Sequence, residues 1–167
     1  MPDSPDHLVI RLSTEAQKTV EFFNALAPGQ WERTVYTEGS CWTVHQVLAH
    51  FVATEKAFRQ LIENVLAGGS GAPEEFNIDS YNERKVAGLR DFSPDELMQQ
   101  FEAQRQANIE LVKRMGPQDL LKTGRHPFLG MTTLEEIIQL LYRHNQIHQR
   151  DMRRLPQAGE EPASQPG

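Results

Sequence analysis

Hydrophobic residues recur every three or four positions along most of this chain, a spacing typical of helices that bury one face. The most continuous example lies in residues 132–155, where alternate steps of three and four trace a single stripe. The members of that stripe are Leu134, Ile137, Leu141, His144, His148, Asp151 and Leu155. Because residues one helical turn apart share a face, the pattern predicts a helix that turns both histidines toward the interior.

The same spacing predicts three more helices, and residues with strong end preferences mark where they begin and stop. Together the predicted helices cover about residues 5–27, 43–67, 93–115 and 132–155. Capping pairs three residues apart mark three of the starts: Thr43 with Gln46, Ser93 with Glu96, and Thr132 or Thr133 with Glu135 or Glu136. The first three helices are followed by Pro28-Gly29, Gly68-Gly69 and Gly116-Pro117, respectively.

The connections between the helices predict the topology. Residues 68–92 form a long connection, typical of a lid or crossover, with space for a short helix in its second half. Residues 116–131 are expected to form a polar loop, and no strand is predicted. We therefore expect an all-α fold: a four-helix bundle in up-down-down-up order, with the long crossover between helices two and three. Residues 1–155 would form this bundle, and the polar segment 156–167 a disordered tail.

Composition narrows the partners. The 167 residues suit one domain, and 17 basic against 23 acidic residues give a net charge of −6, so we expect no nucleic-acid partner. No apolar stretch approaches the length of a membrane span. The single cysteine, Cys41, excludes an intramolecular disulfide and is expected to be structural, and the first residues lack a signal-peptide pattern. These features predict a soluble, cytoplasmic protein.

A third histidine joins the pair on the last helix if the predicted topology holds. His50 lies seven residues inside the start of its helix, and His148 lies seven residues inside the end of the last helix. At 1.5 Å per residue, both would lie about 10 Å from the same end of the bundle when these two helices run antiparallel. Three neutral imidazoles with a free fourth position are typical of a catalytic metal site. Zinc or nickel is the expected ion, and iron also suits such ligands.

These segments resemble the DinB-like superfamily, which includes YfiT-type metal hydrolases and bacillithiol- and mycothiol-dependent S-transferases and isomerases. The resemblance rests on WTVHQVLAHFVATEKAF, FNIDSYNERKVAGLRDFSPDEL and HPFLGMTTLEEIIQLLYRHNQIHQRDMRRL. It implies the same bundle, a divalent metal held by His50, His144 and His148, and frequent homodimers. In the thiol-dependent isomerase branch one ligand on the last helix is commonly glutamate, whereas this chain has His144, which argues against that isomerase.

Four further residues are candidate neighbours of this site. Glu55 either orients a histidine ligand or is a partly exposed glutamate. Tyr81 and Asn82, in the crossover, either cover the site or anchor the loop, and Arg143 either lines an anionic pocket or belongs to a solvated helix end. The remaining histidines are expected at the surface or in loops: His7, His45 and His126.

The expected function is an enzyme in which the metal activates a low-molecular-weight thiol for S-transfer to a small electrophilic substrate. A metal-dependent hydrolase of the YfiT type is one alternative, although no carboxylate is placed as its general base. A metal-binding or stress-response module without turnover is another, and a plain bundle with buried histidines is the third. The sequence assigns no catalytic residue beyond the metal ligands.

Overall fold

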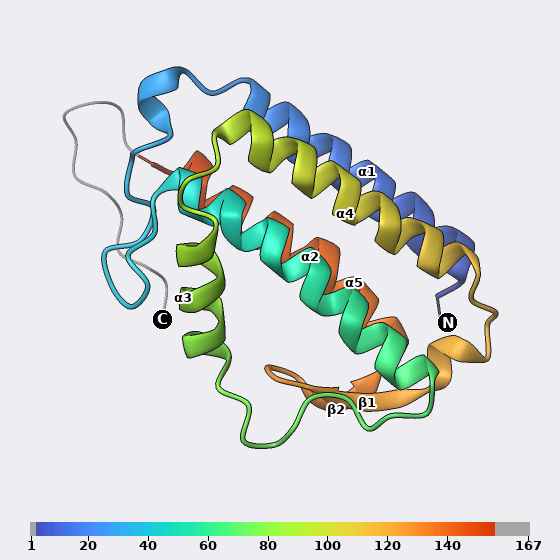
Figure 1. The fold of residues 1–167 in the computed structure, drawn as a ribbon. Helices are drawn as coiled ribbons and strands as arrows, with labels where there is room; N and C mark the ends of the chain where they lie inside the picture. The colour runs from blue at the N-terminus through green and yellow to red at the C-terminus, as the bar shows by residue number, and fades with distance from the viewer. Residues whose placement is uncertain (1–2, 156–167) are drawn as a thin grey trace.

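The computed structural model describes residues 3–155, so the expectation of a disordered tail at 156–167 lies outside the described residues. This part of the chain is mostly helical (Figure 1). The helices are α1 (Pro5–Asn24), α2 (Val44–Leu66), α3 (Ile78–Gly88), α4 (Pro94–Lys113) and α5 (Leu134–Arg153), with short 3₁₀ turns at Pro28–Gln30 and Asp119–Leu121. Two strands, β1 (Thr123–His126) and β2 (Gly130–Thr133), complete the fold.

The predicted helix starts are confirmed by their caps. The Thr43 hydroxyl accepts from the backbone N–H of Gln46 at 3.3 Å, while the Gln46 side chain accepts from the Thr43 N–H at 2.9 Å. Ser93 and Glu96 make the same reciprocal pair at the start of α4. For the last helix the structure selects Thr133, whose hydroxyl caps the N–H of Glu136. Each cap satisfies backbone donors that a helix start leaves unpaired.

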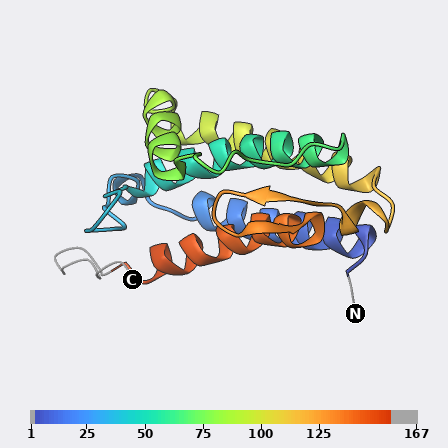
Figure 2. The same ribbon diagram turned by 90° about the horizontal axis from the view of Figure 1, so that it is seen from below.

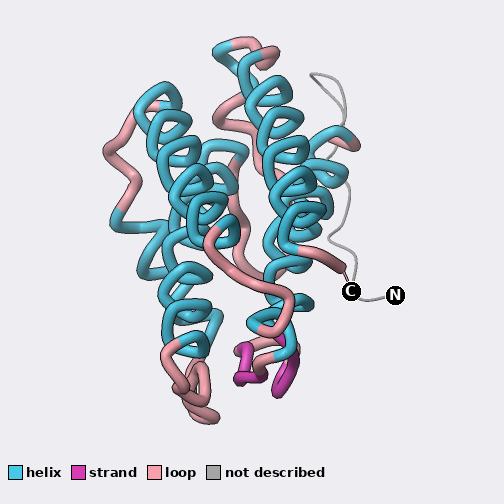
Figure 3. Tube along the Cα trace, turned by 90° about the vertical axis from the view of Figure 1, so that its right-hand side faces the viewer, coloured by secondary structure: helices cyan, strands magenta, loops and turns pink. Residues whose placement is uncertain are grey.

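The long helices pack side by side, with α1 and α2 each in contact with both α4 and α5 (Figures 1 and 3). Their apolar faces form two buried clusters. One contains Leu12, Ile62 and Ile137 and lies toward the hairpin, and the other contains Phe23, Phe51 and Phe101. Burial of these faces is the main source of stability in a helical bundle.

The crossover holds the predicted short helix, α3, which packs on α2 through the buried Val86. A hydrogen bond of 2.8 Å joins the His45 ring to the carbonyl of Phe92 and fixes the far end of the crossover.

Among residues 3–155, no helix combines the length and apolarity needed to cross a bilayer.

The expectation of an unstructured loop before α5 is wrong. Residues 123–133 form an antiparallel hairpin in which Thr123 pairs with Thr133 and His126 with Gly130. β1 lies so close to α2 that a Cβ atom on Gly124 would be 2.4 Å from a methyl group of Val65. The crossover adds a backbone bridge between Gly71 and Arg125. These non-local contacts stabilise strands too short to be recognised from their own residues.

Candidate metal centre

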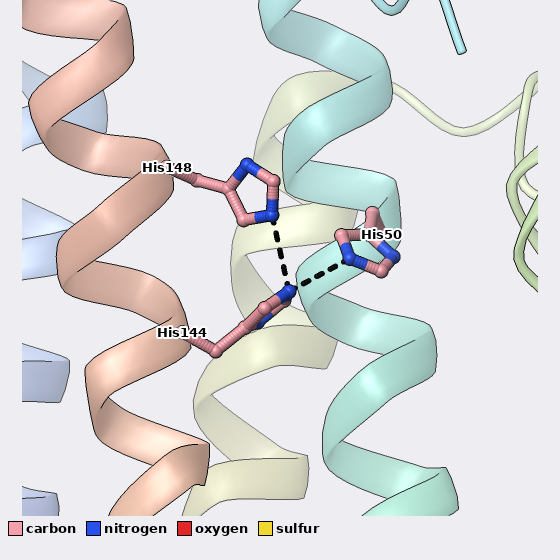
Figure 4. A group of neighbouring side chains, drawn as sticks. All are labelled: His50, His144 and His148. Carbon is pink, nitrogen blue, oxygen red and sulfur yellow. Dashed lines mark hydrogen bonds between the residues drawn. The ribbon is translucent and has the colours of Figure 1, made fainter. Parts of the chain in front are cut away.

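Three histidines from two helices meet between α2 and α5 (Figure 4). The Nε2 atom of His144 lies 2.8 Å from Nε2 of His50 and 3.1 Å from Nε2 of His148. The one-turn spacing on α5 places His144 and His148 on one face, as the periodicity predicts. The structure therefore brings together the three residues that the sequence selected, although His50 and His144 are 94 positions apart.

The cluster is held uncharged. Burial lowers the pKa of His50 to about 3, with a further contribution from the charge of His148, and burial lowers the pKa of His148 to about 4. The pKa of His144 is also lowered well below its ordinary value by burial and by the neighbouring histidines. At neutral pH all three rings are neutral, which is the state that binds a metal ion.

His148 is oriented by a tyrosine that the sequence did not single out. The Tyr36 hydroxyl lies 2.7 Å from Nδ1 of His148 and 2.7 Å from a carboxylate oxygen of Asp151. Burial and Asp151 raise the pKa of Tyr36, so its hydroxyl stays protonated and donates to Asp151. The same oxygen then accepts from the Nδ1–H of His148. This arrangement leaves the Nε2 lone pair of His148 directed at the other two histidines.

The other two rings are held mainly by packing. The Trp42 ring lies 4.6 Å from the His50 ring between centroids, and the Thr54 hydroxyl lies 3.5 Å from His50 Nδ1. Phe51 packs against both His144 and His148. Within residues 3–155 the buried Nδ1 of His144 has no hydrogen-bond partner. Its Nε2 is thus the only nitrogen of that ring engaged with other polar groups of the described chain.

The donor set fits a divalent cation. The three candidate ligand atoms all lie within 4.8 Å of one another. A tetrahedral zinc site with Zn–N bonds of about 2.0–2.1 Å places its nitrogens about 3.4 Å apart. The Nε2 atom of His144, now 2.8 Å from His50 and 3.1 Å from His148, would therefore move away from those two nitrogens by about 0.6 and 0.3 Å. Three close nitrogen atoms whose lone pairs converge are stabilised by a cation between them, whereas neutral rings alone cannot satisfy every pair by hydrogen bonding.

Glu55 is fully buried, and its carboxylate is hydrogen-bonded to groups other than the histidines. Arg105 donates to its two carboxylate oxygens at 2.9 and 2.6 Å, and the Asn108 amide donates at 2.8 Å. Arg105 also donates to the side chain of Asn145, the residue after His144. The interpretation of Glu55 as a partly exposed residue is wrong, because the side chain is buried. Among the described residues, its carboxylate is hydrogen-bonded to Arg105 and Asn108 and to no histidine ring.

The remaining candidates stand apart from the three rings. Tyr81 packs against Phe76, with the ring centroids 5.2 Å apart and the planes tilted by 52°, and lies beneath the cationic side chain of Arg84 in the same crossover segment. Asn82 is half-buried beside it on α3. Arg143 is exposed, because one residue before His144 it is rotated by about 100° around the helix. None of these three has a hydrogen bond to the histidine cluster among the described residues.

One histidine expected at the surface or in a loop is instead buried in a strand. His126 is only 4% exposed, since β1 turns its side chain onto Phe58 of α2, with the ring centroids 5.2 Å apart. No periodic pattern indicates burial at this position, because burial depends on a hairpin that the sequence analysis does not predict. His7 is exposed, and the His45 ring is hydrogen-bonded to the backbone carbonyl of Phe92.

Comparison with models of protein families identifies the superfamily of this chain. The model of the DinB superfamily matches residues 11–152, which includes all three histidines. The chain belongs to the DinB superfamily. This confirms the resemblance that the sequence motifs indicated. Among curated protein sequences no match was found.

Solved structures of several other proteins share the fold at low sequence identity. YfiT from Bacillus subtilis, described as a probable metal-dependent hydrolase with an unusual four-helix bundle topology, is 16% identical with a TM-score of 0.74, covering 89% of this chain and 83% of that one. A mycothiol-dependent maleylpyruvate isomerase is 14% identical with a TM-score of 0.71, covering 89% of this chain but 60% of that one. The colibactin self-resistance protein ClbS, in complex with a double-stranded DNA, is 12% identical with a TM-score of 0.69, covering 92% and 97%.

Proposed function

We propose that this DinB-superfamily protein is a metal-dependent enzyme that activates a low-molecular-weight thiol for transfer to a small electrophile. His50, His144 and His148 would hold the ion, with zinc or nickel favoured and iron also suited. The observation that carries the proposal is the meeting of three Nε2 atoms, with the tautomer of His148 fixed by Tyr36. A divalent ion held by three imidazoles keeps an open position and lowers the pKa of a thiol bound there.

The thiol interpretation is supported by the chemistry of the surrounding residues. Hydrolysis at a metal ion is commonly assisted by a free carboxylate or histidine that takes a proton from the attacking water. The Asp151 carboxylate accepts from Tyr36, which contacts His148, and Glu55 is paired with Arg105. A thiol needs no such base, because coordination to the ion removes its proton. The fold shared with a mycothiol-dependent enzyme agrees with this interpretation.

Two other functions stay as alternatives. The fold shared with YfiT favours a metal-dependent hydrolase in which the open position takes water. A metal-binding or stress-response module would use the same three ligands without turnover.

We also infer the up-down-down-up helix order, a domain that ends at residue 155, and a homodimer in the cytoplasm. We expect a small-molecule substrate in place of nucleic acid, because the net charge of −6 disfavours binding to phosphate backbones.

Cobalt substitution separates these functions. Addition of a small thiol such as 2-mercaptoethanol to the cobalt-loaded protein is expected to produce a sulfur-to-cobalt charge-transfer absorption. The absorption should be lost in His144→Ala and kept in the control His7→Ala, whose ring is exposed. Consumption of a haloarene or bimane electrophile above the free-solution rate would then identify an S-transferase.

The other outcomes favour the alternatives. Thiol binding without consumption of any electrophile supports the binding module. A cobalt protein whose spectrum ignores thiol, and which cleaves a model ester with a rate that rises through a pKa near about 7, supports the hydrolase.

A further inference from the structure

The metal-site histidines come from opposite layers of the bundle. Figure 2 shows α2 and α4 in one layer and α1 and α5 in the other, and α2 also contacts α5. His50 lies on α2, whereas His144 and His148 lie on α5. The separation of the two layers therefore sets the distance from the His50 Nε2 atom to the other two rings. Metal ligands need to be held within about 0.5 Å of their binding geometry.

The buried Arg105 guanidinium, on α4, joins these two layers. In its own layer it donates to the two carboxylate oxygens of Glu55 on α2, at 2.9 and 2.6 Å. In the opposite layer it donates to the side-chain oxygen of Asn145 on α5 and, at 3.0 Å, to the backbone carbonyl of Leu12 on α1. Among residues 3–155, no other side chain outside the histidine site is hydrogen-bonded to groups on both α2 and α5.

Both ends of this link lie close to metal-site histidines along the chain. Asn145 directly follows His144 and lies three residues, less than one helical turn, before His148. Glu55 lies five residues after His50, or about 7.5 Å along α2. A movement of α5 away from α2 would break the hydrogen bond to Asn145 and separate the histidines at the same time.

Stability alone does not explain why this core position holds an arginine. Replacement of a buried ion pair by apolar side chains of similar volume is often neutral or stabilising, because the cost of desolvating both charges offsets their attraction. A guanidinium, however, is a rigid planar fork that holds several acceptors at fixed positions. Its pairing with Glu55 also means that the link adds no net charge near a bound cation.

We propose that Arg105 is a positioning residue for the metal centre: through Glu55 on α2 and Asn145 on α5, it holds the two layers at the separation at which the three histidines bind one divalent ion. The proposal rests on the proposed function only in taking these histidines as the ligands. Among the described residues Arg105 has no hydrogen bond to the three rings, so it acts through the helices that carry them.

A pair of alanine variants tests the link to α5. Asn145→Ala interrupts that link and keeps the Glu55–Arg105 pair, and its zinc affinity is expected to fall by about tenfold or more, as for other residues that orient metal ligands. Asn108→Ala is the matched control, because Asn108 is equally buried and donates to the Glu55 carboxylate and backbone carbonyl but to nothing on α5. The control should bind zinc as wild type does. Competition with a chromogenic chelator measures the affinity of samples that circular dichroism shows to be folded.

A lysine variant separates geometry from charge. Arg105→Lys keeps the positive charge beside Glu55 but lacks the planar fork, so its zinc affinity should also fall. Because both changes interrupt one link, the double variant Arg105→Lys/Asn145→Ala should bind zinc no more weakly than the weaker of the two single variants.

Cobalt absorption distinguishes positioning from a merely structural role. The d–d bands of the cobalt-loaded protein should move in Asn145→Ala and stay in place in Asn108→Ala. A structural role would lower the free energy of unfolding of both variants without moving the bands of either. Equal zinc affinities and equal cobalt spectra for these two variants would overturn the proposal.

The metal-free protein distinguishes this failure from failure of the metal site. In that protein the side-chain ¹⁵N resonances of His50, on the helix opposite Asn145, are expected to shift in Asn145→Ala and not in Asn108→Ala. If wild type binds neither zinc nor cobalt, the proposed metal site is wrong. The His50 resonances then decide the role of Arg105: a shift supports it as the residue that positions the rings, and no shift overturns it.

Discussion

At the scale of single residues, burial keeps the metal-site histidines neutral below the pH at which exposed histidines take up protons. An ordinary histidine titrates near about 6.5, whereas burial lowers the pKa of His148 to about 4. Protons therefore compete with a metal ion for these histidines only at a pH lower than that at which exposed histidines take up protons. The same difference links stability to pH, because the unfolded chain binds protons that the folded chain excludes.

The sign of this linkage gives a prediction for the metal-free protein. Its free energy of unfolding should be steady above about pH 6.5 and fall as the pH drops toward 4, since over that range the unfolded chain takes up protons that the buried histidines do not. Replacement of His148 by Gln should reduce the protons taken up on unfolding by about one, because the lowered pKa of this ring no longer contributes. Urea unfolding at several pH values measures this, and equal slopes for wild type and His148→Gln would show that the ring is solvated.

Tyr36 provides a second prediction at this scale. Tyr36→Phe removes the hydroxyl that fixes the tautomer of His148, with little change in ring packing. Loss of such an outer hydrogen bond commonly weakens metal binding by about 10-fold to 100-fold. Competition with a chromogenic chelator measures the affinity. Tyr142→Phe on α5 is the matched control and should bind as wild type does. Equal affinities for all three proteins would mean that Tyr36 does not orient the ligand.

At the scale of the elements, a buried ion pair joins α2 to α4. Glu55 and Arg105 are each about 1% exposed at the side chain, and Arg105 also donates to the carbonyl of Leu12 on α1. Removing one member leaves the other charge buried without its partner, which costs about 3–5 kcal/mol. Arg105→Met is therefore expected to lose that much stability by urea unfolding.

The double variant Glu55→Gln/Arg105→Met tests the reason for that loss. It should recover a clear part of the stability, because no unpaired charge is left in the core. A double variant as unstable as the sum of both single variants would show that packing, and not charge, is responsible.

The contact of the hairpin with α2 gives a further prediction. Gly124→Ala would place a Cβ atom 2.4 Å from the Val65 side chain, so strand and helix must separate. Overpacking of this kind costs about 1–3 kcal/mol. Gly29→Ala, where nothing lies within 4 Å of the added atom, is the control and should be nearly neutral. Thermal unfolding compares the two variants. A Gly124→Ala protein as stable as the control would show that the hairpin is not held against α2.

The elements also show what the sequence can predict. The helix ends followed from local chemistry, since the caps at Thr43 and Ser93 need only residues within one turn. The hairpin was missed because its four-residue strands are stabilised by α2 and by the crossover, not by their own pattern. Burial of His126 depends on that hairpin, so it was missed with it.

For the whole molecule, the prediction of the site depended on helix positions more than on any single motif. His50 could be matched to His144 and His148 because bundle helices are straight enough for positions along them to be compared. Tyr36 could not be matched, since it lies in a loop 112 residues from His148, where no periodicity applies. The partner of Glu55 was missed for a related reason: a charged arginine on the core face of α4 departs from the apolar pattern.

The most direct measurement is the metal content of the purified chain. Wild type and His7→Ala are expected to carry close to one divalent ion per chain by elemental mass spectrometry after dialysis, because the three histidines form one site. His50→Ala, His144→Ala and His148→Ala should each carry far less while keeping the helical circular dichroism of the wild type. Undiminished metal in His50→Ala and His148→Ala, or no metal in wild type after incubation with zinc and with nickel, would contradict the three-histidine metal site.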